Sequence, residues 1–416
     1  MKKSRILLTC TSLLLCFSLT ACSVKSQAVN LMEGITPNEV TALSDLSSYN
    51  GDIADFAVRL FKASADGNEN ILISPLSVLY AVSMTANGAN GDTRREIEET
   101  IGMTIDELNN YLYSYMKGLS QDEKAKLSLA DSIWFTDHER FTVNPDFLQK
   151  NADFYGADIY KVPFNDETCK DINDWVKENT DGMIENILDE IPGSAIMYLV
   201  NALAFDGEWV LPYEQSQITT ETFTKEDGTK QTAEFMSCAE YAYLEDENTT
   251  GFIKYYSGGK YAFAALLPNE SVSMSEYLST LDGKKLNTLL SSSEETKVLT
   301  KIPKFESSYS EEMMDTLFAM GIKKAFDPEK ADFQGLGSSD AGNIFVSRVL
   351  HKTYISIDER GTKAGASTVV EMSDECCVEL LPVEYKEVYL DRPFVYMLID
   401  RENNIPFFIG TTMSIE

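Results

Sequence analysis

The sequence has few histidines and lacks the motifs that mark the common classes of enzyme. It has two histidines in 416 residues, His138 and His351, and no Gly-x-Ser-x-Gly, His-Glu-x-x-His, P-loop or Cys-x-x-Cys motif. These absences disfavour hydrolases, zinc proteases, nucleotide-hydrolysing enzymes and thioredoxin-like enzymes. His351 lies in an apolar run that predicts a strand, where a hydrogen-bonded core histidine is the usual interpretation. We therefore expect no catalytic residue, no metal ion and no cofactor.

Cysteine is too sparse and too poorly spaced to form a disulfide framework. Three of the seven cysteines fall within the first 22 residues. Cys376 and Cys377 are adjacent, which rarely suits a mutual disulfide and does not match the ligand spacing of a metal site. Cys169 and Cys238 are isolated, and each is expected to be a small buried hydrophobic residue. A domain of this size needs no disulfides to be stable.

Positive charge is also scarce. The chain has 35 Lys and Arg against 66 Asp and Glu, a formal charge of −31 at pH 7. Such a charge opposes binding to nucleic acid, to heparin-like polyanions and to anionic lipid. No Pro/Gly/Ser-rich linker, internal repeat or low-complexity block interrupts the chain after the first 50 residues, so we expect a single domain over residues 51–416 and a monomer.

The first 50 residues are typical of targeting rather than of a fold. Lys2, Lys3 and Arg5 precede a mainly apolar run at residues 6–19 that is too short for a confident membrane span. The sequence Leu-Thr-Ala-Cys then ends at Cys22 and matches the lipobox of a bacterial lipoprotein.

We expect a signal peptide at residues 1–21, lipidation of Cys22, and a polar tether at residues 22–50 that holds an extracellular domain near the membrane. The membrane would be contacted only through this anchor. Loss of the three basic residues takes the charge from −31 to −34 on the mature chain. The alternative is a plain secretory signal with an incidental cysteine.

The element pattern changes along the chain. Helical periodicity begins at Ile53, and Ser74 before proline predicts a helix N-cap. Thr93 with Glu96, and Thr104 with Glu107, have the spacing of capping boxes. From residue 196 onward strands dominate, beginning with a nearly continuous apolar run that predicts a buried central strand. Helices first and then mixed sheets indicate an α+β fold.

The segment at residues 358–373 is small and flexible like a loop, yet it alternates like a strand. One face carries no charge and the other carries both charges of residues 362–373, Lys363 and Glu371. A loop already patterned as a half-buried strand suggests a metastable protein. The alternative is an ordinary edge strand of small residues. The uncharged face consists of Thr362, Ala364, Ala366, Thr368, Val370 and Met372.

Short motifs between residues 70 and 394 indicate what kind of protein carries this loop. They are NILISPLS (70–77), NGANGDT (87–93), INDWV (172–176), TDG (180–182), VNA (200–202), FDGEW (205–209), IPKF (302–305), ADF (331–333), HK (351–352), ERGT (359–362) and DRPF (391–394). In this order and spacing, the chain resembles a serpin. The resemblance implies an α+β, single-domain serpin fold with three β-sheets, about nine helices and an exposed reactive-centre loop.

The resemblance also implies a mechanism, in which the protein acts as a suicide substrate of serine proteases. A protease cleaves the loop, and the loop enters the main sheet as a new strand and traps the acyl-enzyme. Lys363 departs from the glutamate that is usual in the family, and Arg360 is also basic, but both are expected to face solvent. The implied hinge residues are Glu359, Gly361, Thr362, Ala364, Gly365 and Ala366.

Two further groups follow from the resemblance. Ser74, Ser77, Asn201 and His351 match the shutter, a hydrogen-bonded polar cluster beneath the central strands. Trp209, with Glu359, matches the breach, where insertion begins. The helix that binds polyanions in some serpins would lie near residues 107–116, which have no basic cluster.

The position of the cleaved bond follows from a count. Inhibitory serpins usually place the bait residue sixteen positions after the hinge glutamate, which gives Glu375 and a Glu375–Cys376 bond. Asp374 and Cys376 are the neighbouring alternatives. The implied partners are glutamate-specific or elastase-like serine proteases. The competing interpretations are a non-inhibitory serpin that acts as a surface binding protein and, with only the export signal in its favour, a surface hydrolase.

Overall fold

The computed structural model describes residues 28–65, 68–119, 124–137, 141–191, 196–340, 342–362 and 385–415. Several predicted positions lie outside the described residues: Cys22, His138, Lys363, Ala364, Gly365, Ala366, Asp374, Glu375, Cys376 and Cys377.

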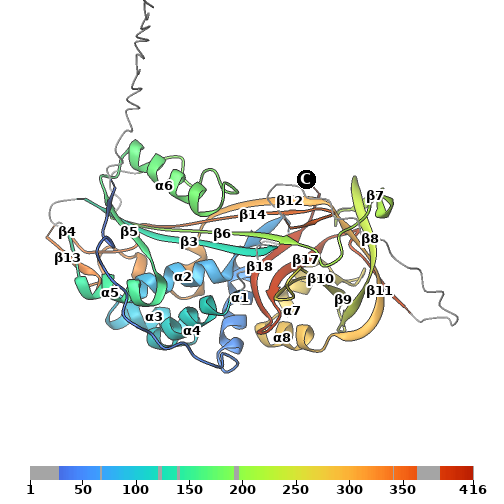
Figure 1. The fold of residues 1–416 in the computed structure, drawn as a ribbon, viewed down its shortest axis with the longest axis horizontal. Coiled ribbons are helices and arrows are strands. Elements are labelled where there is room, and N and C mark those ends of the chain that lie inside the picture. Colours follow the sequence, from blue (N-terminus) through green and yellow to red (C-terminus); the bar gives the residue numbers. More distant parts are fainter. Residues whose placement is uncertain are drawn as a thin grey trace, which may run out of the picture.

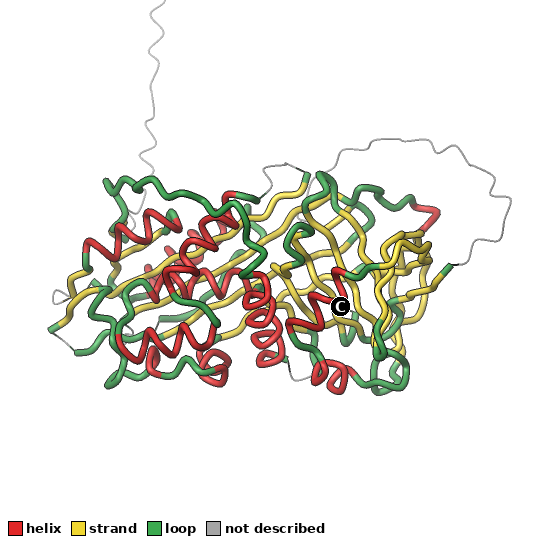
Figure 2. Tube along the Cα trace, turned by 90° about the horizontal axis from the view of Figure 1, so that it is seen from below, coloured by secondary structure: helices red, strands yellow, loops and turns green. Residues whose placement is uncertain are grey.

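Nine α-helices occur in the described residues, and they gather mainly at one end of the molecule, with strands at the other (Figure 2). Their starts follow local chemistry. The Ser74 side chain accepts the Ser77 N–H at the start of α2, and Thr104 and Glu107 form the predicted capping box of α4. The helices are α1 (Asn50–Ser64), α2 (Pro75–Ala86), α3 (Gly91–Ile101), α4 (Ile105–Lys117), α5 (Pro145–Tyr155), α6 (Asp166–Asn179), α7 (Met274–Thr280), α8 (Gly283–Ser291) and α9 (Met314–Met320), with short 3₁₀ turns η1 (Gln215–Gln217) and η2 (Lys324–Phe326).

The main sheet has seven strands and crosses the length of the helical end (Figure 1). Helix α6 covers one face, and α2 lies with other helices against the opposite face. In spatial order the strands are β1 (Val29–Asn30), β5 (Asp158–Val162), β3 (Ala125–Thr136), β6 (Met197–Glu208), β15 (Gly361–Thr362), β14 (Arg348–Ile357) and β12 (Phe305–Glu312). Because both faces of β6 are covered, its first nine residues are all buried.

A second sheet of nine strands forms the other end. Its main path is β16 (Lys386–Tyr389), β11 (Glu294–Pro303), β8 (Lys230–Glu245), β9 (Thr249–Tyr255), β10 (Tyr261–Pro268), β17 (Phe394–Asp400), β18 (Ile405–Thr412) and β2 (Ile71–Ile73), and β7 (Ile218–Thr224) pairs with β8. A third, two-stranded sheet joins β13 (Gly337–Ser339) to β4 (Phe141–Val143).

Alternate residues of the central strands pack on two different cores. Leu199, Leu203 and Phe205 of β6 belong to the large core shared with helices α1 and α2 and the second sheet. Tyr198, Val200 and Ala202 belong to a smaller core beneath α6. The period-two pattern of a strand therefore assigns each side chain of the main sheet to one side.

The predicted α+β fold with three sheets and about nine helices is confirmed for the described residues. Among these residues, no helix is long and apolar enough to cross a membrane.

One local prediction was wrong. The capping box expected at Thr93 and Glu96 does not exist, because α3 already begins at Gly91 with Asn90 as its N-cap.

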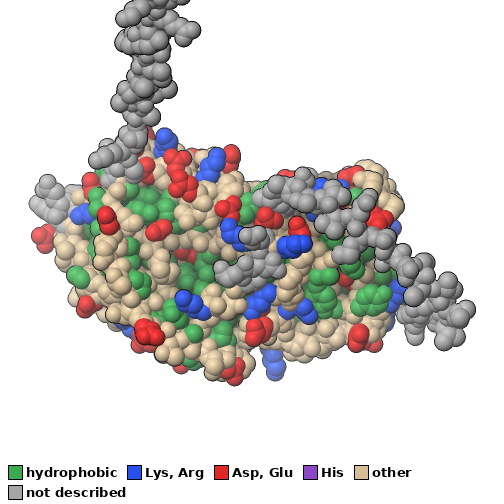
Figure 3. All heavy atoms as spheres, viewed as in Figure 1, with side chains coloured by type: hydrophobic (Ala, Val, Ile, Leu, Met, Phe, Trp, Pro, Cys, Tyr) green, Lys and Arg blue, Asp and Glu red, His purple; other side chains and the backbone are tan. Residues whose placement is uncertain are grey.

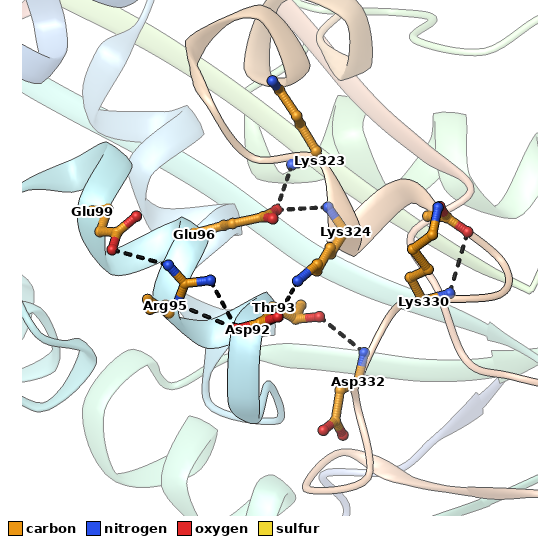
Figure 4. A network of polar contacts seen from close by, with 10 residues as sticks. Asp92, Thr93, Arg95, Glu96, Glu99, Lys323, Lys324, Lys330 and Asp332 are labelled. Carbon is orange, nitrogen blue, oxygen red and sulfur yellow. Dashed lines mark hydrogen bonds and ion pairs between the residues drawn. The ribbon is translucent and has the colours of Figure 1, made fainter.

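Both side chains of the false capping box make tertiary contacts instead (Figure 4). The Thr93 hydroxyl accepts the Asp332 N–H at 2.9 Å, and Glu96 accepts the N–H groups of Lys323 and Lys324 at 2.9 and 2.7 Å. Helix α3 is thereby joined to the segment that leads from α9 towards β14.

Candidate functional site

Strands β6 and β14 pair directly with each other along part of their length, and a third strand lies between them further along. The two strands pair directly, in parallel, from Arg348 opposite Tyr198 to Thr353 opposite Leu203. Beyond that point the chain turns back after β14, and β15 lies between the two strands. The main sheet is therefore already widened by one short strand at this end.

Thr362 occupies the end of this short strand. It lies opposite Gly207 of β6 and Ile357 of β14, and its side chain is 1% exposed. Its hydroxyl contacts the buried Tyr256 hydroxyl. The Tyr256 ring stacks on Trp209, with ring centroids 4.4 Å apart and an interplanar angle of 15°. Thr362 is thus held by main-chain pairing on both sides and by a hydroxyl beneath it.

A glycine is required at position 361 because the backbone of β6 lies very close to it, and not because the position needs unusual backbone freedom. The φ of Gly361 is not in the left-handed region, where glycine is favoured over other residues. A Cβ at this position would lie 1.8 Å from the Gly207 carbonyl oxygen. The missing side chain of Gly361 therefore allows β15 to lie against the backbone of β6.

Trp209, the residue predicted for the breach, binds the turn that leads into β15. Its Nε1–H donates to the Asp358 carbonyl at 3.0 Å, and its backbone N–H donates to the Arg360 carbonyl at 2.7 Å. Glu359 forms an ion pair with Lys304, with 2.8 Å between Nζ and Oε2, and this hydrogen bond lowers the pKa of Glu359. The turn that leads into β15 is therefore fixed at three successive residues.

A buried lysine beneath Trp209 was missed by the sequence analysis. Lys254 is 3% exposed, and its Nζ lies 2.7 Å from Glu240 Oε1 and 5.2 Å from the Trp209 ring centroid. Cys238, expected to be a buried hydrophobic residue, is only half-buried and lies in this polar cluster, with Sγ 3.2 Å from Glu240 Oε1. Burial raises the pKa of the Cys238 thiol. A lysine within the apolar strand β9 was the available signal.

The four predicted shutter residues are brought together at the N-terminus of α2. The Ser77 hydroxyl donates to Asn201 Oδ1 at 2.8 Å, and the Ser74 backbone N–H donates to His351 Nε2 at 3.1 Å. Because Nε2 accepts, the neutral imidazole carries its hydrogen on Nδ1, which donates to the same Asn201 oxygen. Complete burial lowers the pKa of His351 to about 3. Uncharged hydrogen bonds therefore join β6, β14 and α2.

Asp131 of β3 lies beside this cluster and was also missed. It belongs to the row of alternate residues that faces the large core, with Leu127, Leu129, Ile133 and Phe135. An acid in an otherwise apolar row of a strand was the signal that would have identified it. Its strand partner across the sheet is Asn201.

No group of three or more His, Cys, Asp or Glu able to hold a metal ion occurs within the described ranges.

The family and its solved structures agree with this architecture. Residues 52–415 match the family model described as serpin (serine protease inhibitor). Tengpin, a thermophilic serpin, is 46% identical in its native state, with a TM-score of 0.89 over 94% of this chain and 100% of that chain. The latent state of the same protein gives a TM-score of 0.79 at 42% identity over 92% of this chain and 100% of that chain.

Two curated relatives are more distant. Human neuroserpin is 29% identical over 88% of this chain and 91% of its own length. An uncharacterized serpin-like protein of Thermococcus kodakarensis is 27% identical over 87% of this chain and 84% of its own length. Because the family model covers nearly all of the sequence beyond residue 51, the chain belongs to the serpin (serine protease inhibitor) family.

Proposed function

We propose that this protein is an exported suicide-substrate inhibitor of serine proteases. The protease serine attacks the carbonyl of the bait residue, an acyl bond forms, and the C–N bond of the loop breaks to release an amine. The freed loop then enters the main sheet between β6 and β14. The protease is carried with it, and the acyl-enzyme is trapped before water can hydrolyse it.

The observation that carries this proposal is the position of β15. Its last residue, Thr362, is the first member of the uncharged row of the loop, and it is already buried between the two strands that would have to separate. Residues 364, 366, 368, 370 and 372 have the same parity and carry no charge. Continued pairing in this register would bury only these side chains on the core side.

Insertion is favoured because a strand added to a sheet satisfies main-chain groups on both sides and buries apolar surface. Among the described residues, the last pair of this strand is at Thr362, and direct pairing of β6 with β14 begins at Thr353. The remaining length of the junction would accommodate the rest of the loop only after β14 has moved away from β6.

The first experiment separates an inhibitor from a non-inhibitory serpin that acts as a surface binding protein. The domain is incubated with an elastase and with a glutamyl endopeptidase, and the products are separated on denaturing gels. An inhibitor gives a covalent complex with at least one of them. If every protease that cuts the loop leaves only cleaved chain, the inhibitor proposal is wrong.

Thermal unfolding of the cleaved chain gives an independent result. Insertion adds a strand to the main sheet, so the cleaved chain should unfold at a much higher temperature than the intact chain. An unchanged unfolding temperature after cleavage would favour the binding protein instead.

The proposed reactive bond is Glu375–Cys376, with Asp374 or Cys376 as the bait residue in the neighbouring registers. Mass spectrometry of the C-terminal peptide released from a protease complex locates the bond. A peptide that begins at Cys376 supports Glu375 and a glutamate-specific protease, because an anionic side chain needs a cationic or polar specificity pocket. A peptide that begins at Cys377 supports an elastase-like target, and a cut beyond residue 378 contradicts the count.

We further propose that Cys22 carries a diacylglycerol anchor that holds the inhibitor at the outer surface of a bacterial membrane. The support is the sequence of residues 1–22 alone. Expression of Cys22→Ser in a host that makes lipoproteins should release the protein into the soluble exported fraction. Equal membrane association of Cys22→Ser and the native sequence would exclude the anchor.

A further inference from the structure

Asp131 is a buried acid without a hydrogen-bond donor. Both of its carboxyl oxygens are buried and have no partner among the described residues. Native proteins rarely leave such a group unsatisfied, and an exception needs an explanation. Burial raises the pKa of Asp131 well above its usual range. In the closed sheet burial therefore favours the protonated, uncharged form of this side chain.

A hydrogen-bond donor without a partner among the described residues, Asn201 Nδ2, lies on the neighbouring strand opposite Asp131. Asp131 and Asn201 are opposite each other in the antiparallel pairing of β3 and β6, so their side chains project on the same face with Cβ atoms about 5 Å apart. Asn201 Oδ1 accepts from Ser77 and His351, whereas Asn201 Nδ2 has no partner among the described residues. The closed sheet thus leaves a donor and an acceptor unused side by side.

The groups that face Asp131 provide no cation to stabilise an ionised carboxylate within the described part of the chain. Helix α2 contributes Tyr80, helix α5 contributes Tyr155 against the Tyr80 ring, and β14 contributes His351 behind Asn201. Burial raises the pKa of both tyrosines and lowers that of His351, so all three are neutral near pH 7. Ionisation of Asp131 therefore opposes the closed sheet.

Opening of the sheet changes the contacts of Asn201. A strand inserted between β6 and β14 separates them by a further strand spacing, about 4.8 Å, so His351 can no longer reach Asn201. Asn201 belongs to β6 and stays beside β3. Released from His351, its amide is free to turn and donate through Nδ2 to Asp131, and such a hydrogen bond is strongest when the acceptor is charged.

We propose that Asp131 is a positioning residue of sheet opening: it loses its proton to solvent as the sheet opens and, as a carboxylate, accepts the Asn201 amide that His351 has released. Opening is then coupled to the release of one proton and becomes easier as the pH rises. The inference extends the proposed function, because loop insertion requires this opening. It does not require that a protease be trapped.

The test measures how fast the native chain leaves its closed form, by loop insertion or by unfolding, at a temperature where the half-life is minutes to hours. Tryptophan fluorescence follows the reaction between pH 5 and 8 for the native sequence and for Asp131→Asn. The ratio of the native-sequence rate to the variant rate should rise with pH, by at most about tenfold per pH unit. The titration of His351 is common to both proteins and cancels in this ratio.

Asp158→Asn is the matched control. Asp158 lies on the neighbouring strand β5 and accepts the Trp175 indole N–H at 2.9 Å, which an asparagine oxygen can also do. This variant should keep the pH dependence of the native sequence. A ratio for Asp131→Asn that does not change with pH overturns the proposal. No protease is present, so failure of the inhibitor proposal would leave the result unaffected.

A second measurement needs no variant and applies if Asp131→Asn does not fold. The native sequence is heated in weakly buffered solution at pH 7.5 with a pH indicator. The ordinary pKa values of carboxyl and imidazole groups lie below this pH, so release of up to about one proton per chain, from Asp131, is expected. Proton uptake, or no exchange, contradicts the assignment.

Discussion

Ser74, Ser77, Asn201 and His351 join α2 to the two strands that must part, and none of them is charged in the native state. His351 uses both ring nitrogens, accepting at Nε2 and donating at Nδ1. Protonation would replace the acceptor with a second donor facing the Ser74 N–H. The cluster is therefore stable only while the imidazole is neutral.

A pH dependence with a definite sign follows from His351. Its native pKa of about 3 is below the usual value of about 6.5, so between these values the unfolded chain binds a proton that the native chain does not. The His351 contribution to stability is complete above pH 6.5 and falls as the pH drops towards 3, by at most about 1.4 kcal/mol per pH unit.

Denaturant unfolding of the native form between pH 4 and 7 measures this contribution. In His351→Gln, which retains an amide donor and acceptor, the decline towards low pH should be smaller than in the native sequence. Equal slopes for the two proteins would show that His351 titrates normally.

Thr362 gives a second prediction for a single residue. In Thr362→Arg a guanidinium would replace a side chain that is 1% exposed and bonded to Tyr256, and burial of an unpaired charge costs several kcal/mol. The variant should be cleaved by the target protease at a normal rate, with little or no covalent complex on denaturing gels. Thr362→Ser, which keeps the hydroxyl, should still form the complex, and full inhibition by Thr362→Arg would show that residue 362 does not remain in the sheet.

Gly361 of β15 lies against the Gly207 backbone of β6, and this contact determines whether the hinge stays in the sheet. In Gly361→Ala the new Cβ would clash with the Gly207 carbonyl oxygen at 1.8 Å. We expect β15 to separate from β6 and the native form to lose about 1–3 kcal/mol of unfolding free energy. Denaturant unfolding measures the change, and Gly51→Ala is the control, because a Cβ on Gly51 would have no neighbouring atom within 4 Å. Equal stability of Gly361→Ala and the native sequence would contradict the role of this contact.

Helix starts were predicted correctly where the capping residues bind within their own turn, and wrongly where those residues bind distant parts of the chain. Ser74 before Pro75, and Thr104 with Glu107, are complete capping signals within one turn, and both helices begin there. Thr93 and Glu96 have the same spacing, but they bind backbone N–H groups more than 220 positions away in the sequence. No local pattern distinguishes the two cases, because the competing partners come from tertiary structure.

The candidate site shows the same limit. Family motifs led to the shutter and breach residues, whose contacts form only in the folded chain. Asp131 was overlooked because its significance depends on its strand register with Asn201, which is a long-range property of the sheet. Gly361 was recognised, but its reason, close approach to Gly207, required the position of a strand far earlier in the sequence.

At the scale of the whole molecule, charge determines which partners can approach. The sequence carries −31, and on the face seen in Figure 3 basic side chains are interspersed with acidic ones rather than gathered in one patch. In α4 the basic side chain of the last turn is Lys117, and the first turn is acidic. A heparin-like polyanion therefore meets net repulsion and no concentrated basic site on this face.

Heparin affinity chromatography of the domain tests this expectation. At roughly 50 mM salt, where phosphate- and sulfate-binding proteins are retained most strongly, the domain should pass through unretained. A basic protein run on the same column is the control. Retention that salt reverses would contradict this expectation.

The short strand β15 also has a kinetic consequence. Cooperative structures such as helices form slowly because the first ordered unit is unfavourable, whereas each later unit adds to an existing template. With Gly361 paired to β6 and Thr362 paired to both β6 and β14, folding has already completed the nucleation of the inserted strand. After cleavage only extension of this strand remains. Each added residue of the loop separates one more residue pair of β6 and β14. Whether the acyl-enzyme is trapped before it is hydrolysed would then depend on the rate of this extension and on the six direct pairs of β6 and β14, of which Asn201–His351 is the third to part.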